Sequence, residues 1–112
     1  MIARGHRFHG YGSLRYVYQN GKTVRGPLTA LKFVANPRRS DYRLAVVVSK
    51  KVNKSAVVRN RIRRRLYEAF RRQEIKTPVD MVLTVFHEQV ATLPAEELET
   101  LVRAQLRQAE IS

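Results

Sequence analysis

The sequence lacks cysteine altogether, which excludes disulfide bonds and thiolate metal sites. It also lacks any apolar run near the roughly 20 residues that span a bilayer, so we expect no membrane association. The first ten residues carry charge and histidine but no hydrophobic segment, which argues against a secretory signal. A cytoplasmic location is therefore the expectation.

Acidic residues are scarce. Nine Asp and Glu stand against 22 Lys and Arg, and the formal net charge is +13. The few carboxylates show no paired spacing suited to acid–base or two-metal chemistry, and the three histidines are scattered along the chain. We therefore predict no catalytic residue and no metal site in the protein, and a self-sufficient protein nuclease is the least favoured function.

The basic residues are concentrated in the first two thirds of the chain. Residues 50–72 hold ten of the 22 basic residues and one acidic residue, Glu68, whereas residues 73–112 hold seven of the nine acidic residues. A field of this kind attracts polyanions and releases the counterions condensed on them. Charge by itself does not choose between RNA, DNA and an anionic membrane surface.

The length of 112 residues and the 44% hydrophobic content predict one domain, residues 1–112, with a modest core. Residues 1–12, with three of the five glycines, are typical of a mobile basic arm. The hydrophobic patterns then predict a helix, two strands, a long helix, a strand and a final helix: 13–20, 27–35, 42–49, 56–73, 79–86 and from residue 94 onward. Residues 23–25 are a candidate for a fourth, short strand. The fold class is α+β, a small α-β sandwich.

Two of these elements have distinctive patterns. Residues 42–49 form a nearly continuous apolar and β-branched run, which predicts a central strand buried on both faces. The long helix carries one apolar stripe at the helical period. Its members are Val58, Ile62, Leu66, Ala69 and Phe70.

The rest of the long helix is strongly basic, with five arginines within residues 59–65. Like charges at this spacing repel each other and destabilise an isolated helix. Solvated helix faces usually mix charges of both signs, whereas this one has only Glu68. The pattern therefore favours a phosphate-binding face over an ordinary solvated one.

The same region carries a specific resemblance. The run Val48-Ser49-Lys50-Lys51, a short loop, and then Arg-Asn-Arg-Ile-Arg-Arg-Arg-Leu over residues 59–66 resembles the signature of the bacterial ribonuclease P protein family. The order of predicted elements also agrees with that family along nearly the whole chain. The resemblance implies a left-handed βαβ crossover, where the general rule would predict a right-handed one.

The resemblance also implies two RNA-binding surfaces. The first would face a catalytic RNA, and its residues would be Lys50, Lys51, Arg59, Asn60, Arg61, Arg63 and Arg64. The second would be a cleft between the first helix and the sheet that binds the single-stranded 5′ leader of precursor tRNA. The matching positions are Leu14 and Tyr18, where the family commonly has two aromatic residues. Phe33 is a third candidate, although core packing explains it better.

The implied function is that of an RNA-binding subunit of ribonuclease P, which removes the 5′ leader of precursor tRNA. The chemistry would lie in the RNA and in Mg²⁺ held mainly by the RNA, with one monomeric protein per RNA. A structural RNA-binding protein of ribosomal type, or an RNA chaperone, is the alternative. A DNA-binding regulator is less favoured, because a strand and a loop precede the arginine helix where a helix-turn-helix needs another helix.

Overall fold

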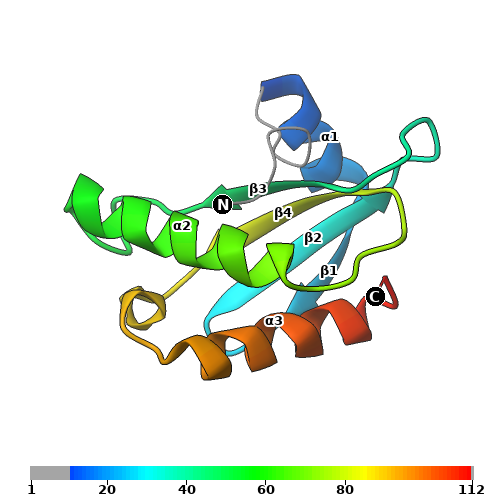
Figure 1. The fold of residues 1–112 in the computed structure, drawn as a ribbon. Helices are drawn as coiled ribbons and strands as arrows, with labels where there is room; N and C mark the ends of the chain where they lie inside the picture. Colours follow the sequence, from blue (N-terminus) through cyan, green and yellow to red (C-terminus); the bar gives the residue numbers. More distant parts are fainter. Residues whose placement is uncertain (1–10, 112) are drawn as a thin grey trace.

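The structure, a computed structural model, describes residues 11–111, with side chains from residue 14 onward. Its elements are α1 (Tyr11–Asn20), β1 (Lys22–Arg25), β2 (Thr29–Ala35), β3 (Arg43–Val47), α2 (Ala56–Arg71), β4 (Val79–Val85), the 3-10 helix η2 (Glu88–Ala91) and α3 (Ala95–Gln108) (Figure 1). The predicted α+β class and element order are confirmed, and the candidate fourth strand is β1.

Helices cover both faces of the sheet. The larger core lies on one face, where α2 and α3 pack against alternate residues of the strands, such as Leu31, Leu44 and Met81. On the other face α1 contributes Val17 to a small cluster with Ala45 and Val82. Successive residues of a strand point to opposite faces, so β2, β3 and β4 supply both cores.

The four strands form one sheet in the order β1-β2-β4-β3, in which only β3 and β4 are parallel. The prediction of a central strand at residues 42–49 was wrong, because β3 lies at the edge and β4 is central. The residues of β3 are apolar because helices cover both faces of the strand, and not because other strands pair with both of its edges. At the open edge, the backbone N–H of Val46 donates to the hydroxyl of the buried Tyr67 at 3.2 Å.

The chain passes from β3 through α2 to the parallel strand β4. In Figure 1 both strands run to the left, α2 lies in front of the sheet, and β4 lies below β3. This arrangement makes the crossover left-handed, as the family resemblance implies and contrary to the general preference.

The end of α1 is fastened closely to the sheet. Gly21 donates its backbone N–H to Val17 O at 2.8 Å. A Cβ atom at Gly21 would lie 2.6 Å from Val17 O and 2.9 Å from Phe33 O, so only glycine fits this approach. At the other end, Tyr11 and Gly12 begin α1 rather than belonging to the predicted arm. The remainder of that arm, residues 1–10, lies outside the described residues.

Helix α3 is tied to the β1–β2 turn through a buried polar side chain. Gln105 Nε2 donates to Thr29 O at 3.1 Å, and Gln105 Oε1 accepts from Thr29 Oγ1 at 2.9 Å. The turn residue Gly26 lies directly against it, since a Cβ there would be 3.1 Å from Gln105 Nε2. These bonds hold the turn that follows Arg25.

Candidate nucleic-acid interface

The start of α2 is built by local hydrogen bonds in the loop before it. Ser55 is the N-cap, and its Oγ accepts from Val58 N at 3.3 Å. Asn53 Oδ1 accepts from Ser55 N at 2.8 Å, which shapes the loop. Arg59 Nη1 donates to the carbonyl oxygens of Asn53 and Lys54 at 3.0 and 2.9 Å. Part of the Arg59 guanidinium therefore closes the loop, besides any contact that it makes with a ligand.

The following turns of α2 present unneutralised positive charge. Arg61 and Arg64 are exposed, and within the described residues neither forms an ion pair or a side-chain hydrogen bond. Arg63 Nη2 donates to Asn60 Oδ1, so the amide orients a guanidinium without cancelling its charge. Lys50 and Lys51 are exposed in the loop that leads into α2. We name Lys50, Lys51, Arg59, Asn60, Arg61, Arg63 and Arg64 the arginine row; all seven lie in α2 or this loop.

Arg65, although adjacent to Arg64, serves the fold. Its guanidinium donates to Val90 O at 2.6 Å and to Leu93 O, which fastens the segment around η2 to α2. The sequence contained a weak signal for this role. Position 65 lies three residues after Ile62 and four before Ala69, on the flank of the buried stripe.

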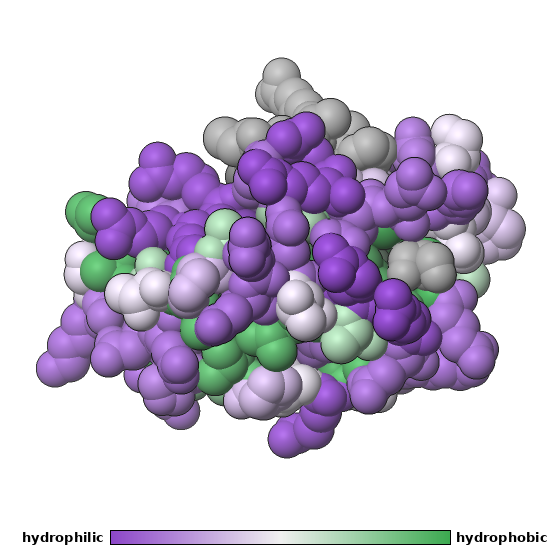
Figure 2. All heavy atoms as spheres, turned by 60° about the horizontal axis from the view of Figure 1, so that its bottom comes forward, coloured by the Kyte–Doolittle hydropathy of each residue, from purple (hydrophilic) through white to green (hydrophobic). Residues whose placement is uncertain are grey.

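The arginines in and just after the last turn of α2 are paired with carboxylates. Glu68 accepts hydrogen bonds from Arg71 and Arg72, and Arg72 Nη1 also donates to Glu99 Oε1 of α3 at 3.0 Å. The hydrogen bond from Arg71 is the main reason that the pKa of Glu68 falls to about 2. These arginines therefore belong to a surface with balanced charge. Figure 2, in which the α3 side comes forward, shows mainly hydrophilic side chains with small hydrophobic areas between them.

The candidate leader-binding residues lie on opposite faces of the sheet. Leu14 packs with the cluster under α1, and Tyr18 is exposed on the same helix. Phe33 instead packs against the core under α2 and α3, so the structure does not bring it together with the other two. Lys32, which precedes Phe33 on β2, has its side chain on the α1 face. Its Nζ donates to Tyr18 O at 2.8 Å and lies 5.8 Å from the centroid of the Tyr18 ring. Strand alternation places consecutive residues on opposite faces.

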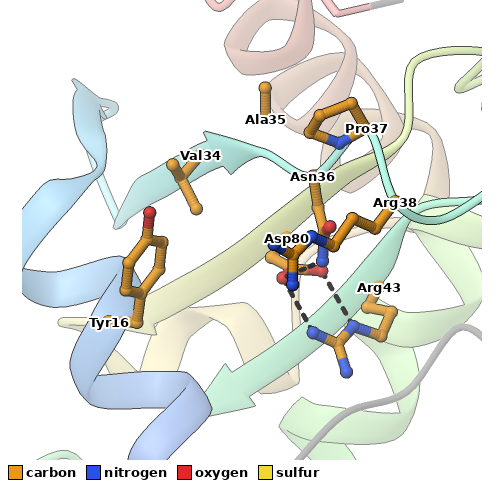
Figure 3. Close-up of a pocket in the computed structure, with 8 residues that line it drawn as sticks. All are labelled: Tyr16, Val34, Ala35, Asn36, Pro37, Arg38, Arg43 and Asp80. Atoms are coloured by element: carbon orange, nitrogen blue, oxygen red, sulfur yellow. Dashed lines mark hydrogen bonds and ion pairs between the residues drawn. The ribbon is translucent and has the colours of Figure 1, made fainter.

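A hollow of about 560 Å³ opens on the other flank of α1, with Tyr16 at one side and the β2–β3 turn at the other (Figure 3). At its base the buried Asp80 carboxylate accepts from Arg43 Nε and Nη2, both at 2.8 Å, and from Asn36 Nδ2 at 2.9 Å. Burial raises the pKa of Asp80, but the hydrogen bonds from Arg43 and Asn36 outweigh it, and the pKa lies below the ordinary value. Asp80 therefore holds the strand ends together as a carboxylate.

Neither a metal cluster nor a membrane span occurs in the part of the chain that the structure describes. Between residues 11 and 111, no three His, Asp or Glu side chains gather in a way that could hold a metal ion. No helix over the same range is long and apolar enough to cross a bilayer. A small basic α+β fold with an unneutralised arginine row on one helix is typical of one class of protein, the nucleic-acid-binding proteins.

Comparisons with known proteins identify the family. The family model described as Ribonuclease P matches residues 2–110. A ribonuclease P protein component from Chloroflexus aurantiacus is 38% identical over 110 residues, covering 96% of this chain and 80% of that protein. One from a Synechococcus species is 36% identical over 87 residues, covering 69% and 68%. The chain belongs to the ribonuclease P protein family, and it is a subunit of that endoribonuclease.

Solved structures agree in fold. The RNase P protein of Staphylococcus aureus superposes with a TM-score of 0.81 at 21% identity, covering 95% of this chain and 96% of that one. The protein of Thermotoga maritima gives a TM-score of 0.80 at 20% identity, with coverage of 91% and 96%. The left-handed crossover and mixed sheet described above are thus elements of a known fold.

Proposed function

We propose that this protein binds the catalytic RNA of ribonuclease P through the arginine row and helps that RNA to remove the 5′ leader from precursor tRNA. The observation that carries the proposal is the absence of acidic partners for Arg61 and Arg64 among the described residues, on the helix whose sequence carries the family signature. Unpaired guanidinium groups fixed on a rigid helix bind phosphate in a bidentate manner.

The protein contributes binding and positioning. The arginine row neutralises phosphates of the catalytic RNA, while Tyr18, Leu14 and the neighbouring sheet surface receive the single-stranded leader. Tyr18 supplies a ring on which a base can stack, whereas Leu14 offers only apolar contact. Lys32 replaces Phe33 in this role, because its ammonium group lies beside the Tyr18 ring. Phe33 supports the sheet from the opposite face.

The chemistry belongs to the RNA partner in this proposal. Mg²⁺ is bound mainly by the RNA, and neutralisation of nearby phosphates by the protein favours its binding and the docking of substrate. One monomeric protein acts with one RNA in the cytoplasm. No residue of this chain takes part in bond cleavage.

Reconstitution tests the proposal directly. The full-length protein is added to a bacterial ribonuclease P RNA with precursor tRNA at low Mg²⁺, and cleavage at the mature 5′ end is followed. We expect cleavage to be stimulated by the protein and to be absent with the protein alone. Tight RNA binding without stimulation would instead support a structural RNA-binding protein or an RNA chaperone.

The leader contact is tested separately with Tyr18→Ala. The variant is expected to bind leader-bearing precursor about 1–3 kcal/mol more weakly in the complex with the catalytic RNA, the range of one base–aromatic stack. Its affinity for mature tRNA should not change. Equal losses for the two RNAs would remove the leader contact from the proposal.

A further inference from the structure

Besides the exposed tyrosines of α1, an aromatic ring of the sheet itself is exposed on the face that carries α1. Phe86 follows directly after β4, and 48% of its surface is exposed. The guanidinium carbon of Arg25 lies 5.7 Å from the centroid of the Phe86 ring. We propose that Phe86, held by Arg25, is a second stacking site for a nucleotide of the precursor tRNA 5′ leader. This inference rests on the proposed function and deepens it.

The strand register places Phe86 and Tyr18 on one face. Arg25 pairs with Ala30, and Ala30 and Lys32 are two residues apart on β2, so all three side chains point to the same side. Lys32 contacts Tyr18 of α1 on that side. The contact between Arg25 and Phe86 therefore brings the Phe86 ring to the face of the candidate leader cleft.

Phe86 continues the alternation of β4 on that face. Val82, two residues before Thr84, belongs to the cluster under α1, and Phe86 is two residues after Thr84. The backbone N–H of Phe86 donates to Leu28 O at 2.8 Å, which extends the β2–β4 pairing past the end of the strand. The position of the ring is thus set by the sheet rather than by a free loop.

The two aromatic sites are too far apart to contact one nucleotide. Lys32, beside Tyr18, pairs with Val82, and Phe86 lies four residues further along the same strand. Four residues of a strand span about 13 Å, compared with about 3.4 Å between stacked nucleotides. Between the sites the sheet carries the short side chains of Ala30 and Thr84, which pair with each other. An extended leader can therefore lie along this surface and contact each ring with a different base.

The chemistry of the site fits a nucleotide. An exposed ring offers its face to a base, and an adjacent guanidinium can both stack with the base and bind its phosphate. The same pairing of ring and cation occurs at Tyr18 and Lys32. Phe86 also supplies the aromatic surface that Leu14 lacks. Arg25 is held in place because Gln105 fastens the turn after β1 to α3.

Fluorescence of the leader separates the two sites. Precursor tRNAs with a single 2-aminopurine at successive leader positions are bound by the complex of the protein with a bacterial ribonuclease P RNA. Stacking on an aromatic ring quenches the probe. We expect Phe86→Ala to restore fluorescence at a leader position different from the one affected by Tyr18→Ala, and to weaken leader-bearing precursor binding about five- to a hundred-fold.

Matched substitutions identify stacking as the cause. Phe86→Tyr keeps the ring and should bind as the unchanged protein does, whereas Phe86→Leu keeps apolar volume and should behave like Phe86→Ala. Because Phe86 is half exposed, circular dichroism should show an unchanged fold. Full affinity of Phe86→Ala beside a loss in Tyr18→Ala would overturn this inference and leave the proposed function intact. If neither variant distinguished precursor from mature tRNA, leader binding at this face would fail altogether.

Discussion

The two ends of α2 use the same residue type in opposite ways. Near its start, Arg61 and Arg64 are exposed and have no ion pair within the described residues. At its end, Arg71 and Arg72 share the carboxylate of Glu68, and Arg72 reaches Glu99 as well. Both parts of α2 carry arginines that solvent can reach, but among the residues that the structure describes only the arginines of the last turn have carboxylate partners.

This difference shows how a helix of high total charge can carry a localised region of unpaired arginines. Glu68 of α2 and Glu99 of α3 pair with the arginines of the last turn, which would otherwise extend the row. Repulsion within the uncompensated half is offset by burial of the opposite stripe, which includes Ile62, Leu66 and Phe70. Unpaired positive charge is thus confined to the part of α2 before its last turn.

The largest effect on RNA binding is expected from removing the unpaired arginines of α2. The double substitution Arg61→Ala and Arg64→Ala should weaken binding to ribonuclease P RNA by about 1.5–3 kcal/mol per lost phosphate contact. The dependence of log affinity on log salt should flatten by about one unit per contact. Arg71→Ala with Arg72→Ala, measured by the same titrations, should change binding far less. Equal effects of the two doubles would refute the comparison.

The next largest effect is on stability and concerns Arg43, whose guanidinium makes two hydrogen bonds to the Asp80 carboxylate. Asp80→Ala removes the partner of Arg43, and because the Asp80 side chain is 8% exposed, the loss of folding free energy should be about 3 kcal/mol. Thermal and urea unfolding measure this loss. A change below 1 kcal/mol would place the pair among ordinary surface ion pairs.

Acid unfolding tests the same pair from another side. The stability that Asp80 contributes is complete above the pKa of an unfolded aspartate, about 3.9, and is lost as the pH falls through its lower folded-state pKa. Asp80→Asn should therefore be less stable at neutral pH and should lose less stability than the unchanged protein below pH 4. Parallel pH profiles for the two proteins would contradict this assignment.

Arg65 and its neighbour Arg64 give opposite predictions. Arg65→Ala leaves the carbonyls of Val90 and Leu93 without their guanidinium donor, so stability should fall by about 2 kcal/mol while the salt dependence of RNA binding stays unchanged. Arg64→Ala should alter the salt dependence and leave the unfolding midpoint near its original value. Loss of RNA contacts in Arg65→Ala, with the fold unaffected, would place it in the arginine row instead.

The smallest effect should follow from removing the neutralising acid. Glu68→Gln deprives Arg71 of its carboxylate, and RNA binding should become slightly tighter, with a salt dependence steeper by less than one unit. The pair lies at the surface, so the unfolding midpoint should change little. An unchanged salt dependence would mean that the end of α2 lies away from the RNA.

Local patterns predicted most of the elements. The helical stripe from Val58 to Phe70 and the runs at residues 27–35 and 79–86 placed α2, β2 and β4 to within about two residues at each end, because these patterns depend on neighbours along the chain. The run at 42–49 predicted a buried strand but not its place at the edge. Coverage by helices and pairing with strands both favour apolar residues, and the sequence does not separate them.

The candidate site was predicted less completely. The concentration of arginine at residues 59–65 predicted a phosphate-binding face on α2, but not that Arg65 and part of Arg59 hold the loops around α2. Phe33 was paired with α1 where Lys32 lies, because one residue of register exchanges the two faces of a strand. The exposed ring of Phe86 had no signal in its own segment, since its partner Arg25 is 61 positions earlier in the chain.

The sequence by itself determined the absence of cysteine, the basic charge and most of the helices and strands, and it predicted the segment that we propose binds RNA, because composition and periodicity act over a few residues. The tertiary structure alone decided that Arg65 serves the fold, that Arg72 has a second carboxylate partner in α3, and which aromatic rings share the face of α1. Those outcomes depend on contacts between distant segments, such as Arg72 with Glu99 and Arg25 with Phe86. Such contacts arise only when the sheet order and the left-handed crossover bring the segments together.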